Sequence, residues 1–285
     1  MSYFGDIDSP DRVRLDVIWN ESCVDTMQRM PEGFVDLTVT SPPYDDIRVY
    51  GGHSWNWSVF EAAAKALYRV TKDRGVVVWV VSDQTKEGDE TGTSFRQALY
   101  FKKVGFKLFD TMIYVKNGCA AVGSTKTYWG QFEYMFVLSK GLPKTINLIK
   151  DKKNKKPAKA GKQVGRRKRH GSVEKRYLPK DGLSYGRRTN VWEYTAGYGH
   201  TSKDNAAWEH PALFPEKLAR DHIVSWSNPG DIIYDPFGGG GTTAKMAKML
   251  SRHFVASEIE ASYCDIIQER LAAVDRSGIQ IDMFD

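Results

Sequence analysis

Four consecutive glycines lie between an apolar segment and a helical segment near the end of the chain. Ile232–Tyr234 predicts a strand, Asp235–Thr243 follows as Asp-Pro-Phe-Gly-Gly-Gly-Gly-Thr-Thr, and Ala244–Leu250 predicts a helix. The next predicted strand, Phe254–Ser257, ends on Glu258. A strand, a tight glycine turn, a helix and another strand make a unit of a parallel α/β sheet. This feature therefore places the chain in the α/β class.

The rest of the chain has the same alternation of apolar strands and amphipathic helices. The apolar run Val76–Val81 is typical of a strand buried on both faces, as in a mainly parallel sheet. Two later strands, Phe106–Val115 and Phe132–Leu138, are expected to pair antiparallel at one edge. Further strands are predicted at Val17–Trp19 and Val35–Val39, and helices at Val24–Met30, Ser58–Thr71, Ser94–Val104 and Pro215–Trp226.

The strand Val35–Val39 runs directly into Thr40-Ser41-Pro42-Pro43-Tyr44. Two consecutive prolines end a strand ladder, because neither has an N–H to donate. The resulting rigid turn presents a hydroxyl, free carbonyls and an aromatic ring, which suit a planar group bearing an amino function. A strand end that is merely stiffened by proline is the alternative, and the turn alone does not decide between them.

The glycine turn is interpreted as a ligand site. Glycines let a ligand approach the backbone where a Cβ would clash, and Glu258 at the next strand end suits the two hydroxyls of a ribose. A phosphate-binding P-loop is not favoured, because Thr242 follows Gly241 directly without the required lysine. Asp235 disfavours phosphate and suits a cationic ligand. S-adenosylmethionine fits both requirements, because it carries a sulfonium, an ammonium and a ribose. The alternative, glycines that serve only tight packing, is less favoured.

The charge of the chain is concentrated in one segment. The net charge is +6, whereas residues 144–188 hold 17 Lys and Arg against 3 acidic residues, a surplus of 17 − 3 = +14. The remainder therefore carries 6 − 14 = −8. Apolar periodicity stops in this segment, so we expect it to be solvated and not to fold strongly alone. Its charge favours contact with a polyanion over an idle charged loop.

Composition excludes several other classes. Hydrophobic residues make up 41% and charged residues 27% of the 285 residues, as in a soluble globular protein. The longest apolar run is too short to span a bilayer, and the N-terminus does not resemble a secretory signal. The three cysteines are not spaced as metal ligands are, and unpaired thiols are typical of proteins in a reducing cytosol. The six histidines form no HxxxH pair. We therefore predict no metal and a cytoplasmic protein.

Together these motifs carry a family resemblance. Thr40–Tyr44 resembles the (D/N/S)PP(Y/F) catalytic motif of exocyclic-amino DNA methyltransferases, and Asp235–Thr243 resembles their cofactor motif. His210–Leu218 is similar to the segment that precedes the cofactor motif and helps to cover the cofactor. The catalytic motif comes first and the cofactor motif last, as in the circularly permuted β group of N4-cytosine/N6-adenine enzymes. The resemblance implies a Rossmann-like fold with a mainly parallel, seven-stranded-type sheet and a basic insertion.

The resemblance also implies the domain organisation and the site residues. Residues 1–143 would form the catalytic half, 144–189 a target-recognition insertion, and 190–285 the cofactor half of the same domain. The implied catalytic residues are Ser41, Pro42, Pro43 and Tyr44. The implied S-adenosylmethionine contacts are Asp235, Pro236, Phe237, Gly238, Gly240, Thr242, Glu258, Phe214 and Pro215. The expected DNA contacts are Lys152, Lys153, Lys155, Lys156, Arg166, Arg167, Lys168 and Arg169.

The implied reaction is transfer of a methyl group to the amino nitrogen of a base flipped out of double-stranded DNA. Ser41 and the Pro42 carbonyl would accept the amino hydrogens, and Tyr44 would stack on the base. A serine in the first motif position favours cytosine N4, and adenine N6 is the alternative. Cytosine C5 methylation is disfavoured, because the chain has no Pro-Cys pair.

Two other classes stay open at this point. One is a DNA-binding protein that has lost catalysis, and the other is an RNA or protein amino-methyltransferase. The resemblance also leaves open whether the protein forms a homodimer and whether a cognate restriction endonuclease accompanies it. No membrane partner is expected, and the source would be a bacterium, an archaeon or a phage.

Overall fold

The structure is a computed structural model that describes residues 14–44, 55–118, 128–154, 163–177, 184–197, 199–210 and 213–277. The chain divides into two compact units. The first unit comprises Met1–Asn147 and Asn190–Asp285, and the second comprises Leu148–Thr189. The second unit therefore begins a few residues after Lys144, where the sequence suggested that the insertion starts.

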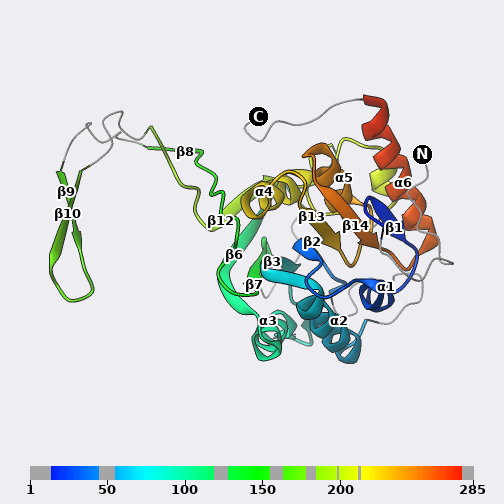
Figure 1. Cartoon of the computed structure of the whole chain (residues 1–285), viewed down its shortest axis with the longest axis horizontal. Helices are drawn as coiled ribbons and strands as arrows, with labels where there is room; N and C mark the ends of the chain where they lie inside the picture. Colours follow the sequence, from blue (N-terminus) through cyan, green and yellow to red (C-terminus); the bar gives the residue numbers. More distant parts are fainter. Residues whose placement is uncertain are drawn as a thin grey trace. The chain divides into compact units, whose positions relative to one another are not determined.

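An eight-stranded sheet forms the centre of the first unit (Figure 1). Strand β7 is antiparallel to both of its neighbours, and the other described pairs of this sheet are parallel. The expected mainly parallel sheet is therefore confirmed. The strand order is β1 (Val17–Trp19), β14 (His253–Ser257), β13 (Ile232–Asp235), β2 (Val35–Thr40), β3 (Thr71–Val81), β7 (Phe132–Ser139), β6 (Lys107–Asn117) and β12 (Val191–Thr195).

One detail of the expected topology is wrong. Strands β6 and β7 do pair antiparallel, but they do not lie at the edge of the sheet, because β12 pairs in parallel with β6. No strand was predicted from the sequence over Val191–Thr195. The basic insertion separates β12 from its partner β6 in the sequence, and local periodicity cannot predict a pairing between such distant segments. The strand β12 thus adds an eighth strand outside the expected seven.

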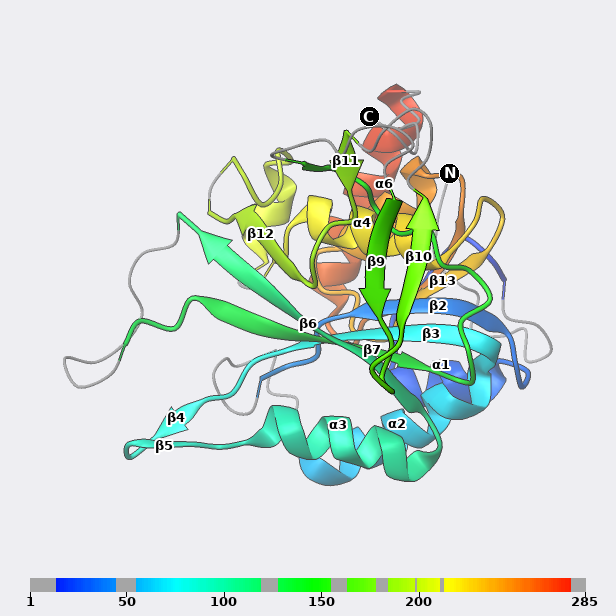
Figure 2. The same cartoon turned by 90° about the vertical axis from the view of Figure 1, so that its left-hand side faces the viewer.

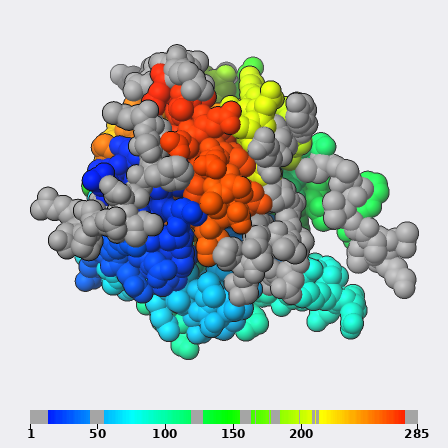
Figure 3. Space-filling model, turned by 90° about the vertical axis from the view of Figure 1, so that its right-hand side faces the viewer, coloured from blue at the N-terminus to red at the C-terminus, as the bar shows by residue number. Residues whose placement is uncertain are grey.

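Helices cover both faces of the sheet (Figures 1 and 2). One layer contains α1 (Cys23–Arg29), α2 (Trp57–Val70) and α3 (Thr93–Val104). The other contains α4 (Glu216–Trp226), α5 (Thr242–Met249) and α6 (Ala261–Ser277). Figure 3 shows the outer side of α6 on the molecular surface. The sequence predicted all of these helices except α6, with ends that differ by one to a few residues, as helix ends commonly do.

The core lies between the sheet and the two helix layers. Every residue of β2 is buried, and so is the run from Val76 to Val81 in β3, as expected for strands covered on both faces. Trp79 is fully buried between Phe60 and Phe101, and its Nε1 donates to Gln97 Oε1 at 2.8 Å. Of the helices within the described ranges, none combines the length and the apolar character that crossing a membrane requires.

The second unit contains two short antiparallel strand pairs, although the sequence suggested no regular structure there. Strand β8 (Lys152–Lys153) pairs with β11 (Tyr185–Gly186), and β9 (Gln163–Arg167) pairs with β10 (Val173–Tyr177). Among the described side chains of the β9–β10 hairpin, none is buried. Without an apolar face, these strands lack the alternation from which a strand is predicted.

The extended loops of the first unit hold two further short elements. Strands β4 (Thr85–Lys86) and β5 (Asp89–Glu90) form a small antiparallel hairpin, and a 3-10 helix, η1, comprises Ala206–Glu209. Asp83 fixes the start of α3 next to this hairpin, because its Oδ1 accepts from the Ser94 backbone N–H at 2.8 Å.

Candidate active site

The carboxyl ends of the parallel strands meet at one edge of the sheet and bring the two sequence motifs together. Strand β2 ends at Thr40 and its neighbour β13 ends at Asp235, so the Pro-Pro turn and the glycine turn begin side by side. Strand β14 delivers Glu258 to the same edge. The antiparallel strand β7 begins at this edge, which places Glu133 there too. Such an edge is where open α/β sheets bind ligands.

A buried hydrogen bond connects the two motifs. The Thr40 hydroxyl donates to Asp235 Oδ1 at 2.7 Å, and the Phe237 backbone N–H donates to the same oxygen at 3.1 Å. Thr243, at the start of α5, donates to the Val39 carbonyl at 3.0 Å. Asp235 is only 2% exposed, and this burial raises its pKa to about 7 despite the hydrogen bonds that favour the carboxylate.

A second chain of hydrogen bonds runs from the Pro-Pro turn along the same edge of the sheet, away from β13, to strands β7 and β6. Ser41 Oγ lies 2.9 Å from Tyr44 Oη, and Tyr44 Oη donates to Glu133 Oε2 at 2.9 Å. Lys116, at the end of β6, donates to Glu133 Oε1 at 3.0 Å. The sequence did not indicate Glu133 and Lys116 as site residues. The only local signal was a carboxylate at the start of an otherwise apolar strand.

Glu258 is fixed by backbone groups. Its Oε2 accepts from the Gly239 N–H at 2.7 Å and its Oε1 accepts from the Glu260 N–H at 2.9 Å. The side chain is buried, which raises its pKa above the ordinary value. Each carboxylate oxygen keeps a second lone pair, so these contacts leave acceptor capacity for a donor such as a hydroxyl.

The chain itself occupies the space next to several glycines of the turn. A Cβ at Gly240 would lie 2.4 Å from Leu213 Cδ2, and a Cβ at Gly241, whose φ is +74°, would lie 2.7 Å from Ile267 Cγ2. Packing against α6 and the segment before α4 is thus one reason for glycine here. The approach of a ligand to this backbone stays a prediction.

A group of four charged side chains contacts the glycine turn, and no sequence pattern indicated it. Its two cations, Arg270 and Lys245, are buried, and its two carboxylates, Asp204 and Glu216, are half-buried. Arg270 is 1% exposed and donates to the Gly240 carbonyl, to Asp204 Oδ2 at 2.9 Å and to Glu216 Oε1 at 2.6 Å. Lys245 donates to the same two carboxylates at 2.7 and 2.8 Å. Burial acts to raise the pKa of Asp204, but the contacts with Lys245 and Arg270 together lower it below the ordinary value. These four residues come from α4, α5, α6 and the loop after β12.

The remaining expected cofactor residues lie in the glycine turn itself or directly before α4. Phe237 packs edge-on against Trp55 and Trp79, with ring centroids at 5.1 and 6.0 Å. Pro236 is buried, Thr242 begins α5, and Gly238 donates its N–H to the Ser257 carbonyl at 2.8 Å. Phe214 is half-buried, and Pro215 is the N-cap residue of α4.

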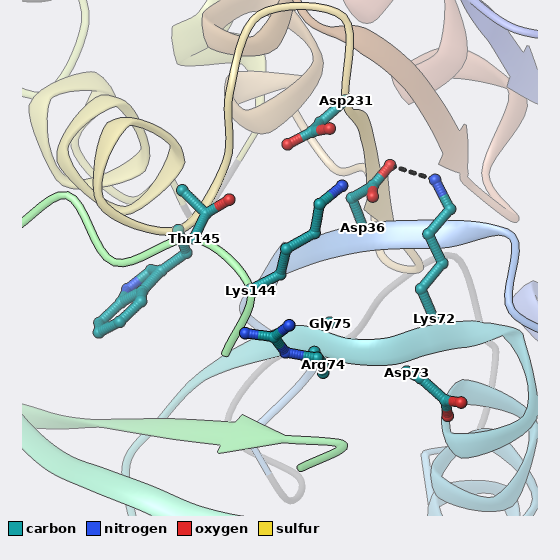
Figure 4. A pocket seen from close by; sticks show the side chains of 9 residues that line it. Asp36, Lys72, Asp73, Arg74, Gly75, Lys144, Thr145 and Asp231 are labelled. Carbon is teal, nitrogen blue, oxygen red and sulfur yellow. Dashed lines mark hydrogen bonds and ion pairs between the residues drawn. The ribbon is translucent and has the colours of Figure 1, made fainter. Parts of the chain in front are cut away.

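A pocket of about 130 Å³ lies at the other edge of the sheet, where β2, β3 and β13 begin (Figure 4). Lys72 donates to Asp36 at 2.5 Å, and Lys144 points toward Asp231 and Asp36 in the figure. The charged side chains that line the pocket are three cations and three carboxylates: Lys72, Arg74, Lys144, Asp36, Asp73 and Asp231. This balance and its position at the amino edge separate it from the motifs described above.

The expected DNA contacts that the structure describes belong to the second unit. Lys152 and Lys153 are exposed in β8. Arg166 lies in β9 opposite Glu174, and Arg167, Lys168 and Arg169 continue into the exposed turn between β9 and β10. Lys155 and Lys156 lie outside the described residues.

Comparisons with known proteins agree with this geometry. A family model described as DNA methylase matches residues 35–269. The chain is 54% identical over 244 residues to a protein described as orphan methyltransferase M.BamHII of Bacillus amyloliquefaciens, covering 83% of this chain and 88% of that one.

Solved structures share the fold at low sequence identity. The PvuII DNA methyltransferase (cytosine-N4-specific) gives a TM-score of 0.62 at 16% identity, covering 89% of this chain and 85% of that one. The M1.HpyAVI–SAM complex gives a TM-score of 0.59 at 21% identity, with coverage of 89% and 98%.

Proposed function

The chain belongs to the DNA methylase family and is an S-adenosylmethionine-dependent N4- or N6-specific DNA methyltransferase, and from this premise we propose that it methylates the N4 amino group of cytosine. The observation that carries the choice of base is Ser41. A neutral hydroxyl stands in the first position of the Pro-Pro motif, where adenine enzymes of this family more often have Asp or Asn. Ser41 lies at the carboxyl end of β2, next to the cofactor turn on β13.

The buried carboxylates at this edge fit the cofactor. Burial disfavours the ionised form and raises the pKa of both Asp235 and Glu258, so a nearby cation or hydrogen-bond donor would stabilise each carboxylate. S-adenosylmethionine carries an ammonium and a sulfonium, and when bound it supplies an electrophilic methyl group. We assign Asp235 to the cationic end and Glu258 to the ribose hydroxyls. Phe237 and the segment at Phe214 and Pro215 provide apolar walls.

The Pro-Pro turn provides acceptors for an amino group. Ser41 Oγ and the Pro42 carbonyl accept the two amino hydrogens, which raises electron density on the nitrogen. The ring of Tyr44 stacks on the flipped base and holds it in the plane of these acceptors. Because the amino nitrogen is itself the nucleophile, the protein contributes positioning and electrostatic stabilisation, and no covalent enzyme intermediate is required.

The second unit is proposed to hold the DNA duplex. Arg167, Lys168 and Arg169 are exposed together at the turn of the β9–β10 hairpin, where they can contact phosphates. Pairing with a restriction endonuclease and formation of a homodimer stay predictions.

The test is to identify the methylated base. Duplex DNA is incubated with labelled S-adenosylmethionine and the purified protein, digested to nucleosides and analysed by mass spectrometry. N4-methylcytosine is the expected product. N6-methyladenine would overturn the choice of base, and cofactor binding without any transfer to DNA would favour a catalytically inactive binding protein. Structured RNA serves as the competing acceptor.

The role of Ser41 is tested in the same assay. Ser41→Ala removes an acceptor that acts on the target nitrogen, so the single-turnover rate should fall while the Kd for S-adenosylmethionine stays within about twofold. Equal losses in rate and cofactor affinity would contradict the assignment.

A further inference from the structure

The hydrogen-bond chain Lys116–Glu133–Tyr44–Ser41 joins three strands at the carboxyl edge of the sheet. Lys116 lies near the end of β6, Glu133 near the start of β7, and the other two residues follow β2. The three links measure 3.0, 2.9 and 2.9 Å. The side chain of Glu133 is only 12% exposed and that of Lys116 is 27% exposed, so solvent screens their ion pair less than it would on an open surface.

The chemistry of the end groups fixes the direction of this chain. A lysine ammonium only donates hydrogen bonds, and an ionised carboxylate only accepts them. Tyr44 must therefore donate its hydroxyl proton to Glu133 Oε2. Its oxygen is then the acceptor for Ser41, which must donate to Tyr44. With its proton directed at Tyr44, Ser41 Oγ presents only lone pairs to any other partner.

An amino group that is to be methylated presents N–H donors, so it requires acceptors. A serine hydroxyl free to rotate would equally well direct its proton at the amino nitrogen and compete for the lone pair that attacks the methyl group. We propose that Glu133, oriented by Lys116, is a positioning residue that acts through Tyr44 to keep Ser41 a hydrogen-bond acceptor for the target amino group. This inference rests on the proposed role of Ser41, and it holds for cytosine and adenine alike.

The substitution Glu133→Gln tests the direction of the chain. Lys116 donates, so the glutamine amide turns its carbonyl toward Lys116 and its NH₂ toward Tyr44. Tyr44 then receives a hydrogen bond from residue 133 and donates toward Ser41, which reverses the chain. We expect the single-turnover rate at saturating DNA and S-adenosylmethionine to fall about tenfold to a hundredfold, as for loss of a hydrogen bond to a charged group. The Kd for S-adenosylmethionine should stay unchanged.

A second substitution distinguishes this mechanism from a general structural role. In Lys116→Met/Glu133→Gln no ammonium competes for the amide oxygen, so the amide can rotate and accept from Tyr44 again. The double variant should be faster than Glu133→Gln by about fivefold or more, which corresponds to about 1 kcal/mol from one neutral hydrogen bond. A double variant as slow as, or slower than, Glu133→Gln overturns the proposal. Glu193→Gln, an exposed carboxylate on the adjacent strand β12, is the matched control and should retain the wild-type rate.

A double-mutant cycle with Tyr44 gives an independent measurement. Tyr44→Phe keeps the ring and removes the hydroxyl, so Glu133 loses its route to Ser41. Glu133→Gln should then cause no further loss of rate in the Tyr44→Phe background. Additive losses would show that Glu133 acts elsewhere, and would overturn the inference while leaving the proposed function intact. A Ser41→Ala variant with the wild-type rate would instead overturn the proposed role of Ser41, on which this inference rests, and the identity of the methylated base tests the proposed function separately.

Discussion

The Thr40 hydroxyl and the Asp235 carboxylate are joined by a buried hydrogen bond of 2.7 Å. Thr40 immediately precedes the proposed catalytic serine, and Asp235 stands at the head of the proposed cofactor turn. The bond therefore fixes the relative position of the proposed methyl acceptor site and the proposed methyl donor site at adjacent strand ends. The two residues are 195 positions apart in the sequence, and the whole second unit lies between them.

Cofactor binding should depend on the ionisation of Asp235. Burial raises the pKa of Asp235 to about 7, so the carboxyl is protonated below that pH and cannot stabilise a cation. The affinity for S-adenosylmethionine should rise as the pH increases through about 7 and then level off. Isothermal titration calorimetry from about pH 6 to about pH 8.5 measures this. Asp235→Asn should bind at least about tenfold more weakly above about pH 8 and should lose the component of the pH dependence that Asp235 contributes. An identical pH profile in both proteins would contradict the assignment.

The same pKa shift predicts a pH-dependent stability in the absence of cofactor. The ordinary pKa of an aspartate is 3.8, and that of Asp235 in the folded protein is about 7. Between these pH values Asp235 is ionised in the unfolded chain but still protonated in the folded chain. The free energy of unfolding should therefore decrease as the pH rises from about 4 to about 7. Above about pH 7 the penalty is constant. Urea unfolding at several pH values tests this, and Asp235→Asn should remove that part of the slope.

Removing the buried arginine of the four-residue charge group should destabilise the protein strongly. Arg270→Met leaves Asp204 and Glu216 with Lys245 as the remaining cation of the group, and it also removes the donor to the Gly240 carbonyl. We expect the free energy of unfolding, measured in urea, to fall by about 3–5 kcal/mol. Lys248→Met breaks the more exposed pair with Asp275 and should cost less than about 1 kcal/mol. Equal losses of unfolding free energy in the two variants would argue against a special role for this charge group.

The basic turn of the second unit should set the salt dependence of DNA binding. Replacing Arg167, Lys168 and Arg169 by alanine should weaken binding and reduce the slope of log K against log salt, by up to about 0.9 for each phosphate that is no longer neutralised. Fluorescence anisotropy with a labelled duplex at several salt concentrations measures both quantities. A triple alanine variant at Lys65, Lys102 and Lys107, which are exposed in the first unit, is the charge-matched control. An unchanged slope in the hairpin variant would show that the turn does not bind phosphates.

Local patterns were sufficient to identify the fold and the two motifs. The apolar run from Val76 to Val81, the proline pair that follows Ser41 and the four glycines after Phe237 each restrict the backbone within a few residues. The family resemblance also implied that the two motifs serve one reaction, as its catalytic motif and its cofactor motif. What it did not predict was α6, β12 as an edge strand, and the paired strands of the basic segment.

The sequence by itself determined the class of fold and the residues that begin each motif, because strand ends, turns and helix starts are encoded locally. Only the tertiary structure decided which charged side chains surround these motifs. Tyr44 and Glu133 are 89 residues apart, and Gly240 and Arg270 are 30 apart, with no periodicity that relates them. Their contacts arise from strand order and helix packing, and these set the direction of a hydrogen-bond chain that no local pattern contains.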